Sequence, residues 1–311
     1  MIASVKALQG RDFIDIADLD PEELRRLIDL AHAIKARRWS ARPLEGRHIA
    51  MLFQKPSHRT RVSFEVGIAR LGGTTTALSE QDVQIGVRET VADAARVLDR
   101  YVDGVVARLR SHDDLLELAA SSAKPVINGL TDRSHPCQVL ADLVTLEELR
   151  GELAGQHVVY VGDGNNVATS LIEASAVAGF ALTVLCPPGY HPKANVLERA
   201  RSISQGTLQV TLTSELADLA GATAIYTDVW ASMGHESERD ERRRAFAPYQ
   251  VNQALMDAAP GAVFMHCLPA HRGEEVTDEV IDGPRSVVFE QAENRLYAQM
   301  AVMAELFGGE R

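Results

Sequence analysis

Short apolar segments alternate with helix-forming segments along most of the chain, and this alternation is the feature that most constrains its fold. After residue 155, five strand-like segments of four or five residues recur, with helical patterns between them. Such alternation predicts parallel strands joined by crossover helices, as in a doubly wound α/β sheet. The five predicted strands are 158–161, 182–185, 208–212, 224–227 and 262–265.

A composition break near residue 150 separates two alternating regions. In the first region, apolar runs at 48–53, 102–107 and 125–128 predict further buried strands. A chain of 311 residues fits two domains of ordinary size. We therefore predict two doubly wound α/β domains with mainly parallel central sheets and an active site in the cleft between them. The predicted limits are 1–149 for the first domain, 150–285 for the second, and 286–311 for a C-terminal helix that packs back on the first.

Composition and charge narrow the range of functions. Asp and Glu number 43 against 32 Lys and Arg, a formal net charge of −11, which argues against a nucleic-acid-binding surface. No apolar run approaches a membrane span and the N-terminus has no signal-like core, so we expect a cytoplasmic protein without a membrane partner. The three cysteines form no C-x-x-C pair, which supports neither a zinc site nor a disulfide framework.

The strongest local signal follows the first apolar run and consists of Ser57, His58, Arg59, Thr60 and Arg61. A helix pattern begins here, and helix starts offer free backbone N–H groups and a positive dipole end. Ser57 and Thr60 add hydroxyl donors, and Arg59 adds a planar guanidinium suited to phosphate oxygens. We favour a phosphate-type anion site over the plainer alternative that Ser57 only caps the helix. The site is not a P-loop, because G-x-x-x-x-G-K-[ST] occurs nowhere.

His135 and Gln138 lie one helical turn apart at the start of a predicted helix, with Pro136 at a first-turn position. Both side chains can therefore point to one ligand. A histidine in this place can donate to a carbonyl oxygen or accept a proton near neutral pH. Local features alone support a ligand-binding role and a purely structural role equally.

The segment from Gly162 to Val167 follows a predicted strand and opens a helix, which invites a dinucleotide-binding interpretation. That interpretation fails because Val167 replaces the third glycine of the fingerprint and no ribose-binding acid follows the next strand. Asn166, at the helix start, is better suited to holding a small carboxylate. A turn with an asparagine cap is the remaining alternative.

Two later strand ends carry further candidates. Asp228 follows the fourth strand of the second region and is suited to an amine. The charged run 236–244 behind it is either a solvated loop or a mobile lid hinged at Gly234. Cys267 follows the fifth strand; a nucleophilic cysteine needs an activating base, and none is visible by spacing. A buried inert thiol, or a thiol that packs against substrate, is the alternative.

Together these motifs resemble the aspartate/ornithine carbamoyltransferase family, and the resemblance covers nearly the whole chain. The family's Ser-x-Arg-Thr-Arg motif matches residues 57–61, and its His-Pro-x-Gln motif matches 135–138. The ornithine-type motif Asp-x-x-x-Ser-Met-Gly matches 228–234, and His-Cys-Leu-Pro matches 266–269. These last two motifs distinguish ornithine-type from aspartate-type members. One departure is His58, which stands where the commonest family version has threonine.

The resemblance implies a set of site residues. The implied catalytic residues are Arg108, His135, Asp228 and Cys267. Gln84 matches a family position that reaches the site of a neighbouring subunit. The implied carbamoyl-phosphate-binding residues are Ser57, His58, Arg59, Thr60, Gln84, Arg108, His135, Gln138, Cys267, Leu268 and Arg295. The implied ornithine-binding residues are Asn166, Asp228, Ser232 and Met233.

The implied reaction transfers the carbamoyl group of carbamoyl phosphate to the side-chain amine of L-ornithine, giving L-citrulline and phosphate within arginine metabolism. The family implies no metal, no organic cofactor, and a homotrimer or a multiple of trimers. Three alternatives stand beside it: transfer to another amine such as putrescine or N-acetylornithine, a nucleotide-dependent oxidoreductase, and a catalytically silent binding subunit. The ornithine-type motif argues against another amine, and the broken glycine fingerprint argues against an oxidoreductase. The intact arginine, histidine and aspartate positions argue against a silent binding subunit.

Overall fold

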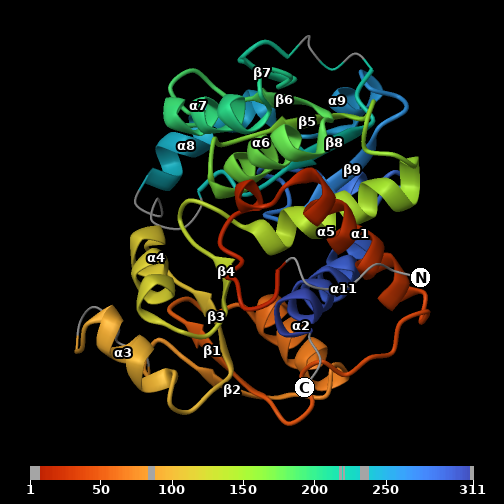
Figure 1. Cartoon of the computed structure of the whole chain (residues 1–311). Coiled ribbons are helices and arrows are strands. Elements are labelled where there is room, and N and C mark those ends of the chain that lie inside the picture. The colour runs from red at the N-terminus through yellow and green to blue at the C-terminus, as the bar shows by residue number, and fades with distance from the viewer. Residues whose placement is uncertain (1–7, 83–87, 217–218, 220, 232–237, 309–311) are drawn as a thin grey trace. The chain divides into compact units, whose positions relative to one another are not determined.

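The computed structural model (Figure 1) describes the chain except residues 1–7, 83–87, 217–218, 220, 232–237 and 309–311. It divides into two compact units, of which the first joins Met1–Leu140 to Asn294–Arg311 and the second is Ala141–Glu293. The second unit is therefore inserted between two stretches of the first. The boundary falls within helix α5 (Pro136–Arg150), earlier than the composition break that follows this helix.

The first unit is built on four parallel strands in the order β2-β1-β3-β4. The two central strands are almost wholly buried on both faces. Continuous apolar strands of this kind are typical of a parallel sheet that helices cover on both sides. The strands are β1 (His48–Phe53), β2 (Thr74–Leu78), β3 (Gly104–Arg108) and β4 (Val126–Leu130).

Strand β2 is not evident from hydrophobic periodicity, because its sequence Thr-Thr-Thr-Ala-Leu is mostly polar and partly exposed. It occupies the edge of the sheet beside β1, where full burial is not required. Its β-branched threonines suit an extended backbone. The Oγ1 of Thr75 also donates to the carbonyl oxygen of Ile49 across 2.7 Å, which ties the strand to its neighbour.

Helix α11 (Val288–Phe307) completes the first unit from the far end of the chain. Two glycines let it approach closely. A Cβ at Gly67 would lie 3.1 Å from Cε of Met303, and a Cβ at Gly104 would collide with the ring of Phe307. The other helices of this unit are the 3-10 helix η1 (Ile16–Asp18), α1 (Pro21–Lys35), α2 (His58–Arg70), α3 (Val91–Leu98) and α4 (His112–Ser121).

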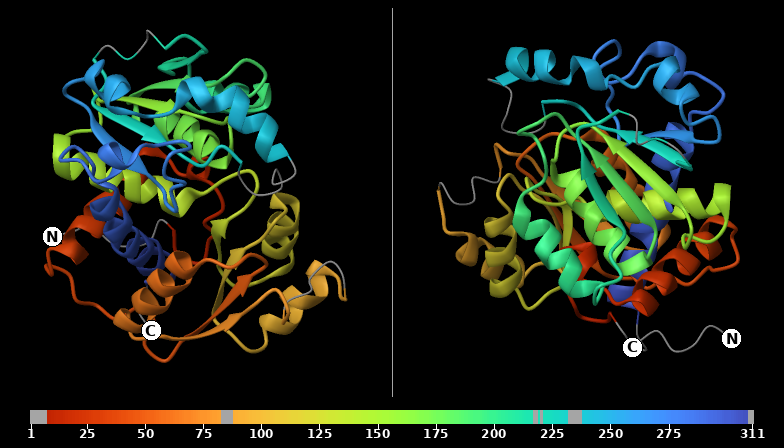
Figure 2. Two further views of the ribbon diagram at one scale, coloured as in Figure 1. Left: turned by 180° about the vertical axis from the view of Figure 1, so that it is seen from behind. Right: turned by 90° about the horizontal axis from the view of Figure 1, so that it is seen from above.

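The second unit contains five parallel strands in the order β7-β6-β5-β8-β9, and Figure 2 shows their twist. The order reverses direction beside β5, so the sheet is doubly wound, and the predicted α/β class with parallel sheets is confirmed. The side chains of Val158, Val159, Tyr160 and Val161 in its central strand are fully buried. The strands are β5 (His157–Val161), β6 (Ala181–Leu185), β7 (Val210–Thr213), β8 (Ala224–Thr227) and β9 (Val263–His266).

Helices follow β5, β6 and β8 along the chain, as the alternation predicts. The helix expected between β7 and β8 is not among the described elements, and residues 217–218 and 220 of that segment lie outside the described residues. Within the part of the chain that the structure describes, none of the helices has the length and apolar character to cross a membrane. The helices of this unit are α6 (Asn166–Ala178), α7 (Ala194–Ile203), α8 (Arg239–Phe246), the 3-10 helix η3 (Ala247–Tyr249), α9 (Gln253–Asp257) and α10 (Asp278–Ile281).

Candidate active site

The turn between β1 and α2 has the form that the anion-site hypothesis requires. Ser57 is the N-cap residue of α2, with an extended backbone at φ −157°. Its hydroxyl accepts the N–H of Thr60 over 3.4 Å and donates to Oγ1 of Thr60 over 3.0 Å. Ser57 is therefore the cap that the plainer alternative expects. Capping does not exclude anion binding, because the N–H groups of a helix's first turn lie outside its hydrogen-bond ladder.

Arg295 reaches the same turn from α11. Its Nη2 donates to Oγ1 of Thr60 over 3.0 Å, and both side chains are buried. Thr60 thus holds two donors on one oxygen, from Ser57 and from Arg295. The guanidinium of Arg295 lies at the N-terminal end of α2, which is the positive end of the helix dipole. The two positive groups repel each other, and an anion that binds between them makes the arrangement favourable.

Arg108 stands at the carboxyl end of β3, directly beside the end of β1. It pairs in register with Phe53, and its carbonyl oxygen accepts the N–H of Gln54 over 3.0 Å. The β3–β4 register shifts between Ala107 and Arg108, so the ladder becomes irregular where the arginine begins. Irregularities of this kind redirect side chains at sheet edges and active sites.

Among the candidate residues of the first unit, His135 has the most altered electrostatics. It is buried, and its pKa lies well below the ordinary value because of burial first and then the positive charges of Arg295, Arg108 and Arg59. Burial and nearby positive charge both disfavour the protonated imidazole, so they act in the same direction. His135 is consequently neutral at pH 7, so it can donate one N–H to a ligand without adding a further positive charge.

Three other residues of the first unit, Gln138, Cys137 and His58, differ in whether their side chains can take part in ligand binding. Gln138 is buried one turn along α5, and its backbone N–H donates to the carbonyl oxygen of His135 over 3.1 Å. Burial raises the pKa of the Cys137 thiol to about 12, so Cys137 is inert. The His58 side chain is exposed at the first position of α2, so only its backbone N–H belongs to the anion turn.

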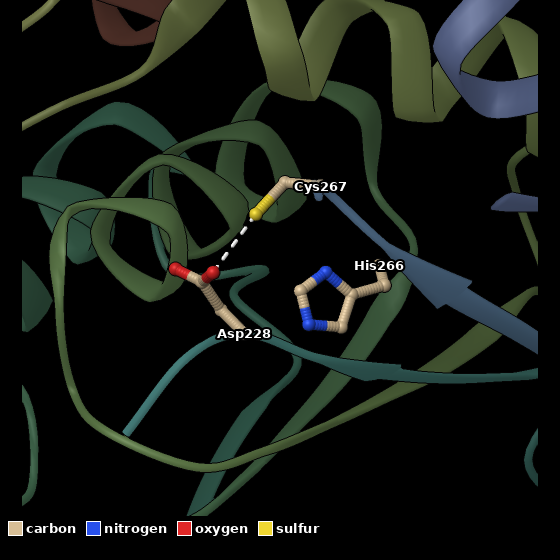
Figure 3. Close-up of side chains that lie close together, drawn as sticks. All are labelled: Asp228, His266 and Cys267. Atoms are coloured by element: carbon tan, nitrogen blue, oxygen red, sulfur yellow. Dashed lines mark hydrogen bonds between the residues drawn. The ribbon is translucent and has the colours of Figure 1, made fainter. Parts of the chain in front are cut away.

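Asp228, directly after β8, is the central candidate residue of the second unit. Its carboxylate accepts three hydrogen bonds: Oδ1 accepts the Val229 N–H over 2.8 Å and the Cys267 thiol over 2.9 Å, and Oδ2 accepts Nδ2 of Asn165 over 2.8 Å. Strand β8 lies between β5 and β9. The carboxyl ends of these three parallel strands therefore bring Asn165, Asp228 and Cys267 together; Figure 3 shows the thiol pointing at the carboxylate.

His266 lies beside this pair (Figure 3), and its side chain is fully buried. Its Nδ1 accepts the N–H of Leu268 over 2.8 Å, so the ring hydrogen is on Nε2, 3.3 Å from Oε1 of the buried Glu275. Ligand atoms of Asp228, His266 and Cys267 lie within 4.8 Å of one another. A cation there would have to displace one of the two bonds of the imidazole. We therefore assign His266 to holding the 267–268 turn, in which Leu268 has the rare φ of 57°.

The segment after β5 contains a residue that sequence analysis missed. The expected asparagine cap exists, but it is Asn165, whose Oδ1 accepts the N–H groups of Val167 and Ala168 over 2.9 and 3.2 Å. Asn166 is the first residue of α6 and is buried. The signal that could have found Asn165 is its place directly before the helix, where asparagine is a preferred cap.

The charged run 236–244 is not simply a solvated loop. Its described part forms most of α8, and Arg242 of that helix is buried. The guanidinium bonds to Oδ2 of Asp163 over 2.9 Å and to the carbonyl oxygen of Trp230 over 3.1 Å, and it lies 5.1 Å from the ring centre of Tyr190. Arg242 therefore joins the loops that follow β5 and β8.

Four of the expected site positions lie outside the described residues. These are Gln84, Ser232, Met233 and the hinge candidate Gly234. The described candidates form two groups, one in each compact unit. The first unit holds Ser57, His58, Arg59, Thr60, Arg108, His135, Gln138 and Arg295, and the second holds Asn166, Asp228, Cys267 and Leu268.

The chain belongs to the aspartate/ornithine carbamoyltransferase family. The family's carbamoyl-phosphate-binding domain matches residues 11–148, and its aspartate/ornithine-binding domain matches residues 154–306. The two matches together cover most of the chain. Each contains the described candidate residues of one unit, except that Arg295 of the first unit falls within the second match.

Named relatives are similar over almost their whole length. Ornithine carbamoyltransferase of Thermococcus kodakarensis is 52% identical over 312 residues, covering 98% of this chain and 99% of that protein. The solved ornithine carbamoyltransferase of Pyrococcus furiosus is 49% identical with a TM-score of 0.92, covering 98% of this chain and 99% of that one. That of Thermus thermophilus is 44% identical with a TM-score of 0.85, covering 94% and 97%.

Proposed function

We propose that this chain transfers the carbamoyl group of carbamoyl phosphate to the side-chain amine of L-ornithine, giving L-citrulline and phosphate. The observation that carries the proposal is a buried histidine, His135, whose pKa is lowered by burial and by the charges of Arg295, Arg108 and Arg59, in the same unit as the buried contact of Arg295 with the α2 turn. A site with three guanidinium groups suits a dianionic phosphate, and a neutral imidazole suits the uncharged carbamoyl group attached to it.

In this proposal the first unit binds carbamoyl phosphate. The α2 turn, with Ser57, Thr60 and the backbone N–H of His58, holds phosphate oxygens together with Arg59 and Arg295. Arg108 contacts both the phosphate and the carbonyl oxygen, and His135 and Gln138 hold the carbamoyl group. Of these groups, Thr60, His135, Gln138 and Arg295 are buried, which strengthens the charge interactions of Arg295 relative to water.

The reaction needs charge stabilisation more than acid chemistry. The nitrogen lone pair of ornithine attacks the carbonyl carbon, negative charge collects on the carbonyl oxygen, and the bond to the phosphate oxygen then breaks. Arg108, Thr60 and His135 oppose the charge on that oxygen. Phosphate leaves with the electrons of the broken bond and accepts the proton that the attacking amine loses, so atoms and charges are conserved in the step.

The second unit binds ornithine in this proposal. Asp228 and Asn166 hold its amine and carboxylate groups, with Ser232 and Met233 assigned to the same role by family resemblance. Cys267 and Leu268 are assigned to contacts with the substrates by family resemblance. The bond from the Cys267 thiol to the Asp228 carboxylate supports a packing and positioning role for this cysteine rather than a nucleophilic one.

Cellular context and assembly are also part of the proposal. We assign the chain to arginine biosynthesis in the cytoplasm, as a homotrimer or a multiple of trimers in which Gln84 completes the site of a neighbouring subunit. One related enzyme, from Pyrococcus furiosus, is named as an anabolic ornithine carbamoyltransferase, which supports the biosynthetic direction.

A citrulline assay with a panel of amines tests the function. The purified chain is incubated with carbamoyl phosphate and either L-ornithine, N-acetylornithine, putrescine or aspartate, and carbamoylated product and phosphate are both measured. We expect equal release of citrulline and phosphate with ornithine and little reaction with the others. Preference for putrescine or N-acetylornithine would replace the acceptor, and no carbamoyl transfer to any amine would reject the proposal.

A further inference from the structure

The amide of Asn165 has one possible orientation in this structure. Its Oδ1 accepts the N–H groups of Val167 and Ala168, and the hydroxyl of Tyr160 donates to the same oxygen over 3.2 Å. Burial and the nearby charge of Asp228 keep the pKa of Tyr160 well above its usual value, so the hydroxyl remains a donor. Because donors surround Oδ1, the Nδ2 end must face Asp228, as it does over 2.8 Å.

The bonds to Asp228 leave its carboxylate little freedom to rotate. Oδ1 accepts from Val229 and from Cys267, which uses both of its lone pairs. Within the described residues, Oδ2 accepts only from Asn165, so one lone pair on Oδ2 remains for a ligand. The side of the carboxylate that can receive an amine is therefore decided by where Nδ2 of Asn165 binds.

We infer that Asn165 is a positioning residue that couples the start of α6 to the ornithine-binding carboxylate of Asp228. The inference rests on the proposed function, because it takes Asp228 to receive an amine of ornithine. Asn165 itself need not touch the substrate. The side chain of Asn165 caps α6 and so positions the neighbouring Asn166. It also orients the Asp228 carboxylate, so one residue sets the relative positions of two groups proposed to hold the substrate.

Asn165→Asp separates positioning from capping. Aspartate caps helices as well as asparagine does and has almost the same size, so α6 is retained. The replacement turns the donor facing Asp228 into an acceptor. Asn165→Ser is the second variant, because serine also caps but is too short to reach Asp228. Asn252, whose side chain accepts the N–H of Leu255 over 3.0 Å at the start of α9, supplies the matched controls Asn252→Asp and Asn252→Ser.

We expect both Asn165 variants to lose roughly 10- to 100-fold in kcat/KM for ornithine while the KM for carbamoyl phosphate changes less than about threefold. Both Asn252 variants should keep wild-type kinetics. An added negative charge would by itself attract the cationic amino acid more strongly. A loss in Asn165→Asp is therefore not explained by weaker attraction of the cationic substrate; it reports the lost donor to Asp228.

A pH series provides a readout that a capping role would not change. In Asn165→Asp, the introduced carboxyl group can donate to Asp228 as the amide does once it is protonated. The ratio of variant to wild-type kcat/KM should therefore rise as the pH falls from 8 to 6. The titratable and charged groups near this pair are Tyr160, Tyr226, His266, Cys267, Cys186 and the ion pair of Asp163 with Arg242. Both enzymes share these groups, so their contribution cancels in the ratio.

The outcomes separate this inference from the proposed function. A wild-type enzyme that makes no citrulline rejects the function itself. An active wild type with Asn165→Asp within twofold of it on ornithine, as for Asn252→Asp, overturns the positioning role. Equal losses for both substrates with a lowered melting temperature overturn it as well, because they indicate a structural cap only.

Discussion

Nη2 of Arg295 donates to Oγ1 of Thr60 over 3.0 Å, although 235 residues separate them in the chain. The bond places a guanidinium of the last helix beside the anion turn that follows the first strand. Its charge also contributes to the lowered pKa of His135. Through Arg295, the C-terminal helix therefore acts on both the α2 turn at Thr60 and His135, the two parts of the proposed carbamoyl-phosphate site.

Arg108→Ala should lower kcat by about 100-fold or more, because it removes the charge that opposes the developing oxyanion. Steady-state kinetics with both substrates measures the effect. Arg110→Ala is the matched control: Arg110 lies two residues further on, is exposed and pairs with Glu80, so its loss should change kcat less than about twofold. Unchanged kcat with only a raised KM in Arg108→Ala would contradict the oxyanion role.

His135→Gln should change how stability depends on pH. Since the pKa of His135 is lowered on folding, the unfolded chain binds a proton below about pH 6.5 while the folded chain does not. The wild type should therefore lose stability relative to the variant as the pH falls below that value, by up to about 1.4 kcal/mol per pH unit. Urea unfolding of both proteins between pH 8 and pH 5 measures this, and parallel curves would show that His135 is not held neutral.

Cys267→Ser should retain most of the activity, with kcat/KM for ornithine reduced less than about tenfold. Serine keeps a donor that can reach Oδ1 of Asp228, the acceptor of the thiol. Cys267→Ala should be the more damaging change, because the carboxylate then loses one of its three donors. Complete and equal loss in both variants would instead indicate a covalent role for the thiolate.

Arg242→Met should destabilise the protein by about 3 kcal/mol, because it leaves Asp163 without its buried partner and removes the donor to Trp230. Arg243→Met is the control: that side chain is 61% exposed, so its loss should cost less than about 0.5 kcal/mol. Thermal unfolding of both variants measures the difference. Near-equal melting temperatures would mean that α8 is only loosely attached.

The rate with ornithine should rise with pH through the neutral range. A free alkylamine has a pKa of about 10.4, and only its neutral form attacks. Near pH 7 the neutral fraction grows about tenfold per pH unit, and desolvation in a buried site moves the rise to lower pH. Measurement of kcat/KM and of kcat from pH 6 to 9 tests this. A flat profile with chemistry rate-limiting would mean that deprotonation is not part of the reaction.

Hydrophobic alternation predicted the fold class because buried parallel strands are apolar on both faces. Hydrophobic alternation did not predict strand β2, because an edge strand can be polar. It did not predict helix α8, because a run of charged residues has no apolar stripe. Arg242 is buried there through its partners Asp163 and Trp230, which lie on loops far away in sequence.

The candidate site was partly predictable for the same reason. Ser57 follows a strand of the first sheet, and Asp228 and Cys267 follow strands of the second; the parallel strands of each sheet gather their carboxyl ends at one edge of that sheet. The proposed role of Asn165 could not be predicted from the sequence, because a preference for the cap position does not tell which group the Nδ2 of the side chain contacts. The contact of Arg295 with Thr60 is set by the packing of α11 on the first unit, for which local sequence carries no signal.

The insertion of one unit into the other has a consequence for biosynthesis. Translation delivers residues 141–293 in one continuous stretch, whereas the first unit stays incomplete until Arg295 and the rest of α11 emerge from the ribosome. Nascent domains usually mature from the N-terminus onward. Here the order is reversed: the unit begun second can finish folding first, and a chain that stops prematurely before residue 294 lacks the guanidinium that completes the proposed phosphate site.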